Sequence, residues 1–239
     1  MQTLLANLEK IHTTPLGLER IRCNLNLQTQ DVVLWCIDTI KQADLIIGQG
    51  KNWYVYHRGV VITIHAKSFT IITAQHLNAK VRLMREEDFV CLPEFLYQAI
   101  FIPQSCEQPP RSIIHDPRIA VYINHFGTKY GDIGVVAEQN HQVIGAAWTR
   151  IIQGHGHIDD ETPELAISIL PEFRGYGIGA SLMNKLFVEL KSNGFKRTSL
   201  SVQKDNPAIR FYERLGYKVT DEKLDHVGNE DFIMIKTLD

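Results

Sequence analysis

The chain has 239 residues, of which 44% are hydrophobic and 22% charged, the composition of an ordinary globular protein with room for two domains. Its formal net charge is −2 and its isoelectric point is about 6.5. The basic excess that gives nucleic-acid binders most of their affinity is missing, so nucleic acid is excluded as the main partner. The N-terminus lacks a signal-peptide pattern and no apolar run approaches the ~20 residues of a membrane span, so a cytoplasmic protein without a membrane partner is expected.

The cysteines are spaced too irregularly for a zinc site. They stand at positions 23, 36, 91 and 106 and include no Cys-x-x-Cys pair. In a reducing compartment such residues are usually small buried hydrophobic side chains. Neither a disulfide nor a bound metal is expected.

The first 78 residues are predicted to form a small α+β domain. Pro15 opens a helix whose apolar stripe is Leu16, Ile21 and Leu25, and Asp31 caps a second helix. The periodicity then changes to short β-branched and aromatic runs separated by glycine and polar residues, which predict strands. These strands are expected at 45–47, 53–56, 60–64 and 70–73.

Residues 79–239 are predicted to form a second domain. A strand at 81–84 precedes a helix that starts at 85 and is kinked or broken by Pro93. The expected order then continues with a loop at 103–111, a helix at 116–126, strands at 133–138 and 143–152, a polar loop at 153–163 and a strand at 164–170. It ends with a helix at 177–192, a strand at 198–203, a helix at 207–215 and strands at 217–224 and 231–237.

The most informative segment is 164–180, where a strand, a glycine-rich turn and a helix follow one another. A glycine turn at a helix N-terminus directs unpaired N–H groups at one point, and the helix dipole adds positive potential. Arg174 adds a permanent charge, so the segment predicts binding of an anion such as a pyrophosphate. The glycine spacing fits neither a P-loop nor a dinucleotide fingerprint.

Two motifs carry a resemblance to a known family. Arg174-x-x-Gly177-x-Gly179 resembles the coenzyme A loop of the GNAT N-acetyltransferases, and the segment 206–217, Asn-Pro-Ala-Ile-Arg-Phe-Tyr-Glu-Arg-Leu-Gly-Tyr, resembles their second signature. The element order matches over 79–239. The resemblance implies a GNAT fold, a mixed and mostly antiparallel sheet flanked by helices, with acetyl-CoA between splayed central strands. Residues 1–78 resemble a small bacterial domain of unknown function.

The resemblance also implies roles for individual residues. Tyr212 would protonate the departing thiolate, and Glu164 is the candidate base, with Asp159, Asp160 and Glu161 as competitors. The residues expected to bind acetyl-CoA are Ile167, Ser168, Ile169, Arg174, Gly175, Tyr176, Gly177, Ile178, Gly179, Ala180 and Asn206. The loop sequence His155-Gly156-His157 is interpreted as a polar loop and not as a metal site.

The implied reaction is direct acetyl transfer to a primary amine of a small molecule or peptide. The segment 89–118 is expected to wall the acceptor pocket, with Phe89, Phe95, Tyr97 and Phe101 as its apolar part. A non-catalytic acyl-CoA-binding regulatory protein of the same fold is the alternative. Two further possibilities are open: residues 1–78 could deliver the enzyme to a protein substrate, and the protein could form a homodimer.

Overall fold

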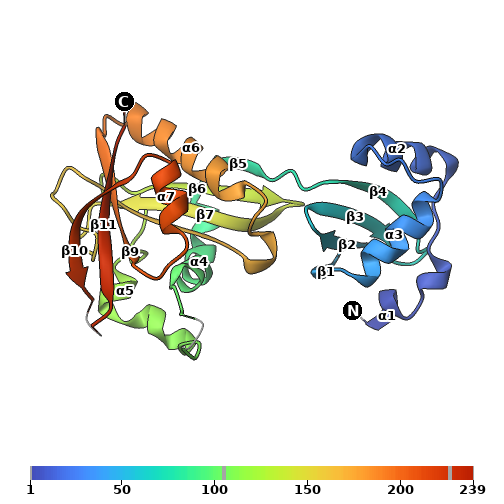
Figure 1. Ribbon diagram of the computed structural model, residues 1–239, viewed down its shortest axis with the longest axis horizontal. Coiled ribbons are helices and arrows are strands. Elements are labelled where there is room, and N and C mark those ends of the chain that lie inside the picture. Colours follow the sequence, from blue (N-terminus) through green and yellow to red (C-terminus); the bar gives the residue numbers. More distant parts are fainter. Residues whose placement is uncertain (1, 104–105, 226–227, 239) are drawn as a thin grey trace. The chain divides into compact units, whose positions relative to one another are not determined.

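The computed structural model describes residues 2–103, 106–225 and 228–238, and the chain separates into two compact units, Met1–Asn78 and Ala79–Asp239 (Figure 1). Each unit has its own sheet and its own buried core. Helices and strands occur in both, so the predicted α+β class is confirmed. Within the described ranges, none of the helices combines the length and the apolar character that a membrane span requires.

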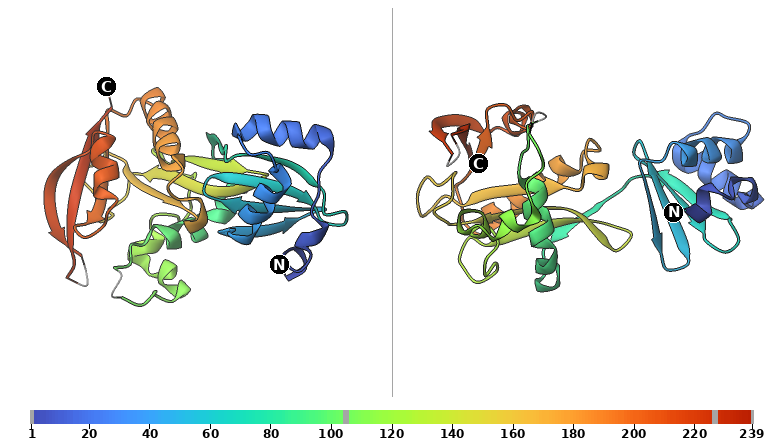
Figure 2. Two further views of the ribbon diagram at one scale, coloured as in Figure 1. Left: turned by 45° about the vertical axis from the view of Figure 1, so that its right-hand side comes forward. Right: turned by 90° about the horizontal axis from the view of Figure 1, so that it is seen from below.

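The first unit is a four-stranded antiparallel sheet in the order β1-β2-β3-β4, with helices on one face (Figure 2). Its elements are α1 Gln2–Leu5, η1 Leu8–Lys10, α2 Pro15–Leu25, α3 Val32–Lys41, β1 Leu45–Gln49, β2 Asn52–His57, β3 Val60–His65 and β4 Ile71–His76. The hydroxyl of Thr14 caps α2 and the carboxylate of Asp31 caps α3, each by accepting a backbone N–H of the first turn. The predicted helices and strands are therefore present.

One detail of the predicted α2 is wrong. Leu16 is 73% exposed, whereas Gly17, Ile21 and Leu25 are buried. Because the stripe of an α-helix repeats every three to four residues, Gly17 and not Leu16 lies one turn from Ile21 on the face toward β4. The core that this face joins is completed by α3 and by the inward side chains of the sheet.

The second unit has a seven-stranded sheet in the order β10-β11-β9-β8-β7-β6-β5. Its strands are β5 Lys80–Leu83, β6 Ile133–Gln139, β7 Gln142–Arg150, β8 Glu164–Ile169, β9 Arg197–Gln203, β10 Lys218–Leu224 and β11 Glu230–Thr237. Its helical segments are η2 Glu86–Cys91, α4 Leu92–Ala99, η3 Arg111–His115, α5 Pro117–Ala120, η4 Pro171–Phe173, α6 Ile178–Ser192 and α7 Ile209–Arg214. All neighbouring strands are antiparallel except β8 and β9, so the predicted GNAT-type sheet is confirmed.

Two predicted helices are shorter than expected. The helix expected from 85 onward is a 3₁₀ segment followed by α4, with Pro93 in the first turn of α4, where its missing N–H has no consequence. The helix expected over 116–126 is α-helical only at Pro117–Ala120 and continues as turns. In these turns, backbone carbonyls of 121–125 accept hydrogen bonds from Trp148 and Arg150 on β7. In a continuous helix, the same carbonyls would have accepted N–H groups of the helix itself.

Helices cover both faces of the central strands. Figure 1 shows α4 and α6 on opposite sides of β6 and β7. Side chains alternate between the faces of a strand, so Ala146 and Trp148 join the core with α4, whereas the Cα of Gly145 faces α6 and a Cβ there would lie 3.3 Å from Leu182 Cδ1. This layering fixes β8 between two packed helices.

The parallel strands β8 and β9 are paired at one end only. In the described residues of the two strands, pairing is confined to Glu164 opposite Ser199, where Ser199 N donates to Pro163 O at 3.1 Å. Beyond this point the strands separate, and the main-chain groups on the facing edge of β8 are not used in the sheet. The candidate site occupies this opening.

Candidate active site

The turn that joins β8 to α6 directs backbone N–H groups into open space. Gly175 and Gly177 have φ angles of +84° and +79°, a conformation that glycine adopts without strain. Gly177 precedes the first turn of α6, and no side chain caps that turn. A Cβ built on either glycine would meet no atom within 4 Å. The N–H groups at this helix N-terminus therefore border a space that an anion can enter.

The third glycine of the motif has a different role in packing. A Cβ on Gly179 would lie 3.3 Å from Phe211 Cζ and 3.4 Å from Ile169 Cδ1. The small residue lets the first turn of α6 approach both β8 and α7 closely. Phe211 in turn contacts the ring of Tyr212, with centroids 5.5 Å apart. The glycine motif thus also positions the helix that carries Tyr212.

Arg174 lies at the end of β8 and does not point along the glycine turn. Its Nε donates to Ile169 O at 2.8 Å, and its Nη2 lies 3.4 Å from Gln98 O at the end of α4. Arg174 is exposed as a residue, and partial burial of its guanidinium lowers the pKa of that group. Arg174 therefore joins β8 to α4 and places a positive charge at the rim of a groove.

That groove has a volume of about 510 Å³ and runs between β8, α4 and the segment before α7. Six of the predicted coenzyme-binding or catalytic residues line it: Ile167, Ser168, Ile169, Arg174, Asn206 and Tyr212. The hydroxyl of Ser168 donates to Phe95 O at 2.6 Å, which attaches β8 to α4. Asn206 Oδ1 accepts from Ala208 N at 2.9 Å, so the side chain also orders the entry to α7.

The free edge of β8 can be identified from its hydrogen bonds. Leu170 N donates to Ile144 O at 3.0 Å, so main-chain groups at even positions face β7. Those of Ile167 and Ile169, at odd positions, face the opening toward β9. Ile167 therefore offers both an N–H and a C=O to a molecule that enters the groove as an additional strand.

Glu164 and Tyr212 line one small cavity of about 190 Å³ between β8, β9 and α7. Tyr212 also lines the 510 Å³ groove, so its side chain stands where the two spaces meet. Burial raises the pKa of Tyr212 to about 12. The phenol is therefore protonated at neutral pH and is able to donate a proton.

The carboxylate of Glu164 is buried and held by the loop before β8 and by the turn after α5. Its Oε1 accepts from the Tyr122 hydroxyl and, at 2.7 Å, from Gly156 N. Burial raises the pKa of Glu164, and these hydrogen bonds oppose the shift. A raised pKa is the property that a carboxylate needs to accept a proton near neutral pH.

Tyr122, Gly154 and Gly156 are site residues that sequence reasoning missed. A Cβ on Gly154 would lie 2.3 Å from Glu164 Oε2, and one on Gly156 would lie 2.8 Å from Glu164 Oε1 and from Ser201 N. Only glycine lets the loop cross the carboxylate this closely. The two glycines beside histidines in the 153–163 loop could have indicated a close approach of this loop to the site. The sequence around Tyr122 contains no comparable signal.

The three competing acids do not line this cavity, and the two histidines have different partners. Asp159 Oδ2 pairs with Arg197 Nη2 at 2.6 Å, and Asp160 and Glu161 line another cavity, of about 540 Å³, on which neither Glu164 nor Tyr212 borders. His157 Nδ1 lies 3.0 Å from Ile152 O. Across the described residues, no group of three or more His, Cys, Asp or Glu side chains is arranged to hold a metal ion.

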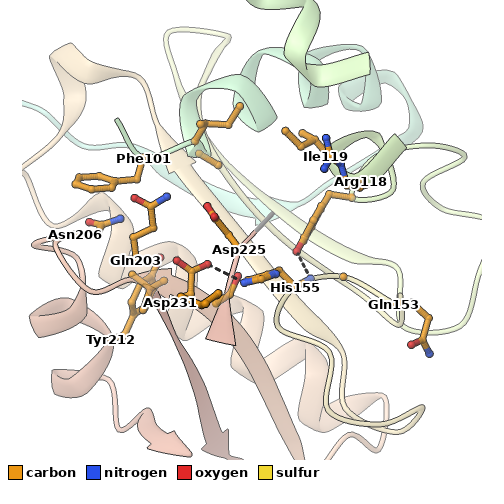
Figure 3. A pocket seen from close by; sticks show the side chains of 17 residues that line it. Phe101, Arg118, Ile119, Gln153, His155, Gln203, Asn206, Tyr212, Asp225 and Asp231 are labelled. Atoms are coloured by element: carbon orange, nitrogen blue, oxygen red, sulfur yellow. Dashed lines mark hydrogen bonds and ion pairs between the residues drawn. The ribbon is translucent and has the colours of Figure 1, made fainter. Parts of the chain in front are cut away.

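A cavity of about 620 Å³ adjoins Tyr212 (Figure 3). Its walls come from the end of α4, α5, the loop before β8, β9, and the ends of β10 and β11. The expected apolar wall from 89–118 is partly wrong: Phe101 lines this cavity, but Phe89 and Phe95 belong to the core and Tyr97 lines the groove. The rings of Phe89 and Phe95 pack against the sheet because they lie on the faces of η2 and α4 that point toward the core.

Two family models match the chain. One, described as a protein of unknown function (DUF3781), matches residues 5–75. The other, described as the acetyltransferase (GNAT) family, matches residues 97–217, just over half of the 239 residues. The two matches fall in different structural units.

Relatives and solved structures agree with the second match. The chain is 32% identical over 98 residues to [ribosomal protein bS18]-alanine N-acetyltransferase of Haemophilus influenzae, covering 41% of this chain and 62%, less than two thirds, of that protein. The phosphinothricin acetyltransferase of Sinorhizobium meliloti, solved with acetyl-CoA, has a TM-score of 0.50 at 20% identity and covers 67% of this chain and 88% of its own. A GNAT acetyltransferase of Streptococcus pneumoniae has a TM-score of 0.50 at 17% identity and covers 68% of this chain and 100% of its own. The chain therefore belongs to the acetyltransferase (GNAT) family, whose model matches within the Ala79–Asp239 unit.

Proposed function

We propose that the protein transfers the acetyl group of acetyl-CoA directly to a primary amine of a small molecule or a peptide, with Tyr212 as the acid and Glu164 as the base. The observation that carries this proposal is the 190 Å³ cavity at the opening between β8 and β9, where the two side chains are brought together. A proton acceptor and a proton donor at one point are what amide formation from a thioester requires.

The open groove and the glycine turn supply a binding site of the right chemistry for acetyl-CoA. The N–H groups from Gly175 to Ala180 face open space and bind the pyrophosphate. The free edge of β8 at Ile167 and Ile169 pairs with the pantetheine arm, and Asn206 borders the same groove. Tyr212, where the groove meets the small cavity, then stands beside the thioester.

The chemistry follows from this placement. The amine nitrogen attacks the thioester carbon, and the outward N–H of Ile167 stabilises the negative charge that develops on the carbonyl oxygen. Glu164 accepts a proton from the nitrogen as the C–S bond breaks, and Tyr212 donates its proton to the departing sulfur. No acetyl group is carried by the protein.

The test is an assay of thiol release from acetyl-CoA against a panel of primary amines. The panel includes polyamines, amino acids, amine antibiotics and a peptide that begins with alanine, because the Haemophilus influenzae relative is named for ribosomal-protein alanine acetylation. Amine-dependent release with at least one acceptor is the expected result. Tight binding of acetyl-CoA without release for any amine would favour the alternative, a non-catalytic acyl-CoA-binding regulatory protein.

A further inference from the structure

The proposed reaction must remove two protons from the acceptor nitrogen. An alkylammonium ion has a pKa of about 10, so only about one molecule in a thousand is neutral and nucleophilic at pH 7. One proton therefore leaves before attack, and a second leaves as the amide forms. The second proton has an acceptor in Glu164, whereas the first has none so far.

His155 and Asp231 form a pair in the wall of the 620 Å³ cavity. Figure 3 shows the imidazole next to the carboxylate, with Tyr212 on one side and Arg118 on the other. His155 Nε2 lies 3.2 Å from Asp231 Oδ2. The Asp231 side chain is 9% exposed and that of His155 is 31% exposed, so the carboxylate stands behind the ring and the ring meets the cavity. A buried carboxylate at ion-pair distance from an imidazole stabilises the imidazolium that forms when the histidine accepts a proton.

Glu164 is poorly placed to meet the ammonium ion first. It lines the 190 Å³ cavity but not the 620 Å³ cavity, whereas Tyr122 and Tyr212 line both. Its Oε1 is occupied by the Tyr122 hydroxyl and Gly156 N. An amine that enters through the large cavity therefore passes His155 before it reaches the point of transfer.

We propose that His155, with Asp231 stabilising its imidazolium, removes the first proton from the bound ammonium group; this assignment rests on the proposed acetyl transfer. The first step is R–NH₃⁺ plus neutral imidazole giving R–NH₂ plus imidazolium, and the imidazolium then loses its proton to solvent. In the second step the C–N bond forms, the C–S bond breaks, the second proton moves to Glu164, and Tyr212 protonates the sulfur. Return of the Glu164 proton to the Tyr212 phenolate restores the site, so one proton is released per acetyl group transferred.

Hydrogen bonds connect the loop that carries His155 to Glu164, the base proposed for the second step. His155 N donates to the Tyr122 hydroxyl at 3.1 Å, and that hydroxyl donates to Glu164 Oε1. Trp148 Nε1 on β7 donates to Tyr122 O at 3.0 Å, which fixes the backbone at the centre of this chain of contacts. The two proton acceptors are thus held by one rigid set of hydrogen bonds.

Charged and titratable side chains from several elements surround the imidazole. The titratable and charged groups around it are Arg118 on α5, Tyr122, Glu164 on β8, Lys223 and Asp225 at the end of β10, and Asp231 on β11. Arg118 is paired with Asp116 through Nε and Nη2, and Lys223 Nζ is directed to His157 O. Burial raises the pKa of Asp231, and the nearby imidazole lowers it, so this carboxylate is stabilised most when the ring is charged.

The test compares His155→Gln with the wild type over a range from about pH 6 to about pH 10, with saturating acetyl-CoA and the amine that gave turnover in the panel. At pH 7 the variant should lose about 10²-fold in kcat/KM for the amine. Because the variant depends on amine that is already neutral in solution, the deficit should shrink by about tenfold per pH unit and disappear by about pH 9, roughly one unit below the pKa of the amine. Asp231→Asn should cause a smaller loss of kcat/KM at pH 7, and this loss should also shrink as the pH rises.

His157→Gln is the matched control, because His157 stands two positions away in the same loop, bonds to Ile152 O and lines none of the three cavities around Tyr212. It should keep the wild-type pH profile, and all three variants should keep the wild-type Kd for acetyl-CoA. A deficit of the same factor at every pH in both His155→Gln and Asp231→Asn, or no deficit, would overturn the assignment. Absence of turnover in the wild type would instead contradict the proposed function.

Discussion

At the scale of single residues, the protonation state of Tyr212 determines what that side chain can do. Its pKa of about 12 results from burial beside Phe211 and Tyr217, so the phenol keeps its proton across the range in which enzymes usually work. An acid with such a pKa is effective only toward a strong base, which a thiolate leaving in a poorly solvated cavity becomes. The residue is therefore suited to protonate the sulfur and unsuited to accept a proton.

Tyr212→Phe removes this proton donor and leaves the ring contacts in place. We expect kcat to fall by about 10²-fold with little change in the KM for acetyl-CoA, since a general acid acts only in the transition state. Steady-state thiol release measures both constants. Tyr130→Phe, which alters an exposed hydroxyl bonded to Asn193 O, should leave both constants unchanged. Retention of the full kcat in Tyr212→Phe would remove Tyr212 from the chemistry.

The glycine turn provides a second test at the residue scale. Gly177→Ala places a methyl group in the space that the N–H groups border and imposes a positive φ on alanine. We expect the Kd for acetyl-CoA to rise at least about tenfold, with a loss of about 1 kcal/mol in the free energy of unfolding. Gly194→Ala matches the strain, because Gly194 has a φ of +84° and equally open surroundings at the other end of α6. Calorimetry should show weakened binding for Gly177→Ala alone; an equal loss for both would assign the effect to the fold.

At the scale of elements, the edge strand β5 is fixed to η2 by one cluster of charges. Arg82 Nη1 and Nη2 donate to both oxygens of Asp88 at 2.6 and 2.9 Å, and Arg82 Nε donates to Glu138 Oε2 at 2.8 Å on β6. Asp88 Oδ2 also accepts from Arg85 N at 2.7 Å and so caps η2. The Asp88 carboxylate is 6% exposed, and the Arg82 guanidinium holds the pKa of Asp88 below its usual value.

The sign of the resulting pH dependence follows from the lowered pKa. The carboxylate stabilises the fold above the unfolded pKa of about 4, and that contribution is lost as the pH falls through the folded pKa. Asp88→Asn should therefore lower the free energy of unfolding by about 2 kcal/mol at pH 7 and flatten its decline below about pH 4. Urea unfolding at several pH values measures this. Glu87→Gln, which alters an exposed pair with Arg85, should change stability by less than about 0.5 kcal/mol, and an equal effect of the two variants would contradict the assignment.

At the scale of the whole molecule, each unit has the properties of an independent domain. All residues that line the three cavities around Tyr212 belong to Ala79–Asp239, and the helices and sheet of the first unit enclose a core of their own. An element that neither lines the site nor completes its core has no direct means of changing the chemistry. We therefore expect the second unit to carry out acetyl transfer without residues of the first.

Deletion of residues 1–78 should accordingly leave kcat and KM for a small amine unchanged. Differential scanning calorimetry of the full chain should show two transitions, of which the shortened protein retains one. A fall in kcat/KM that is confined to peptide or protein acceptors would indicate that the first unit delivers the enzyme to a macromolecular substrate. Loss of activity toward every acceptor would show that the second unit depends on the first.

Local signals in the sequence were sufficient for most elements. Asp31 and Thr14 cap helices because a short polar side chain can reach the first-turn N–H groups from one position away. Asn140 and His141 form a tight hairpin turn with positive φ, between the strands predicted at 133–138 and 143–152. The motif at 174–179 identified the family, because it depends on residues only a few positions apart.

The proton acceptors, in contrast, were decided by tertiary structure. Tyr122 contacts Glu164 across 42 positions and His155 across 33. The two glycines that flank His155 are a local signal, but no residue next to Tyr122 or Glu164 indicates either contact. Glu164, the first residue of β8, is buried, whereas Glu161, three positions earlier, is exposed. The sequence by itself determined the strand, turn and helix to which we assign diphosphate binding, since these elements are specified by residues close together in the chain. Only the folded chain decided that Glu164 is desolvated and that His155 lies against Asp231, since both depend on residues distant in sequence that pack around these groups.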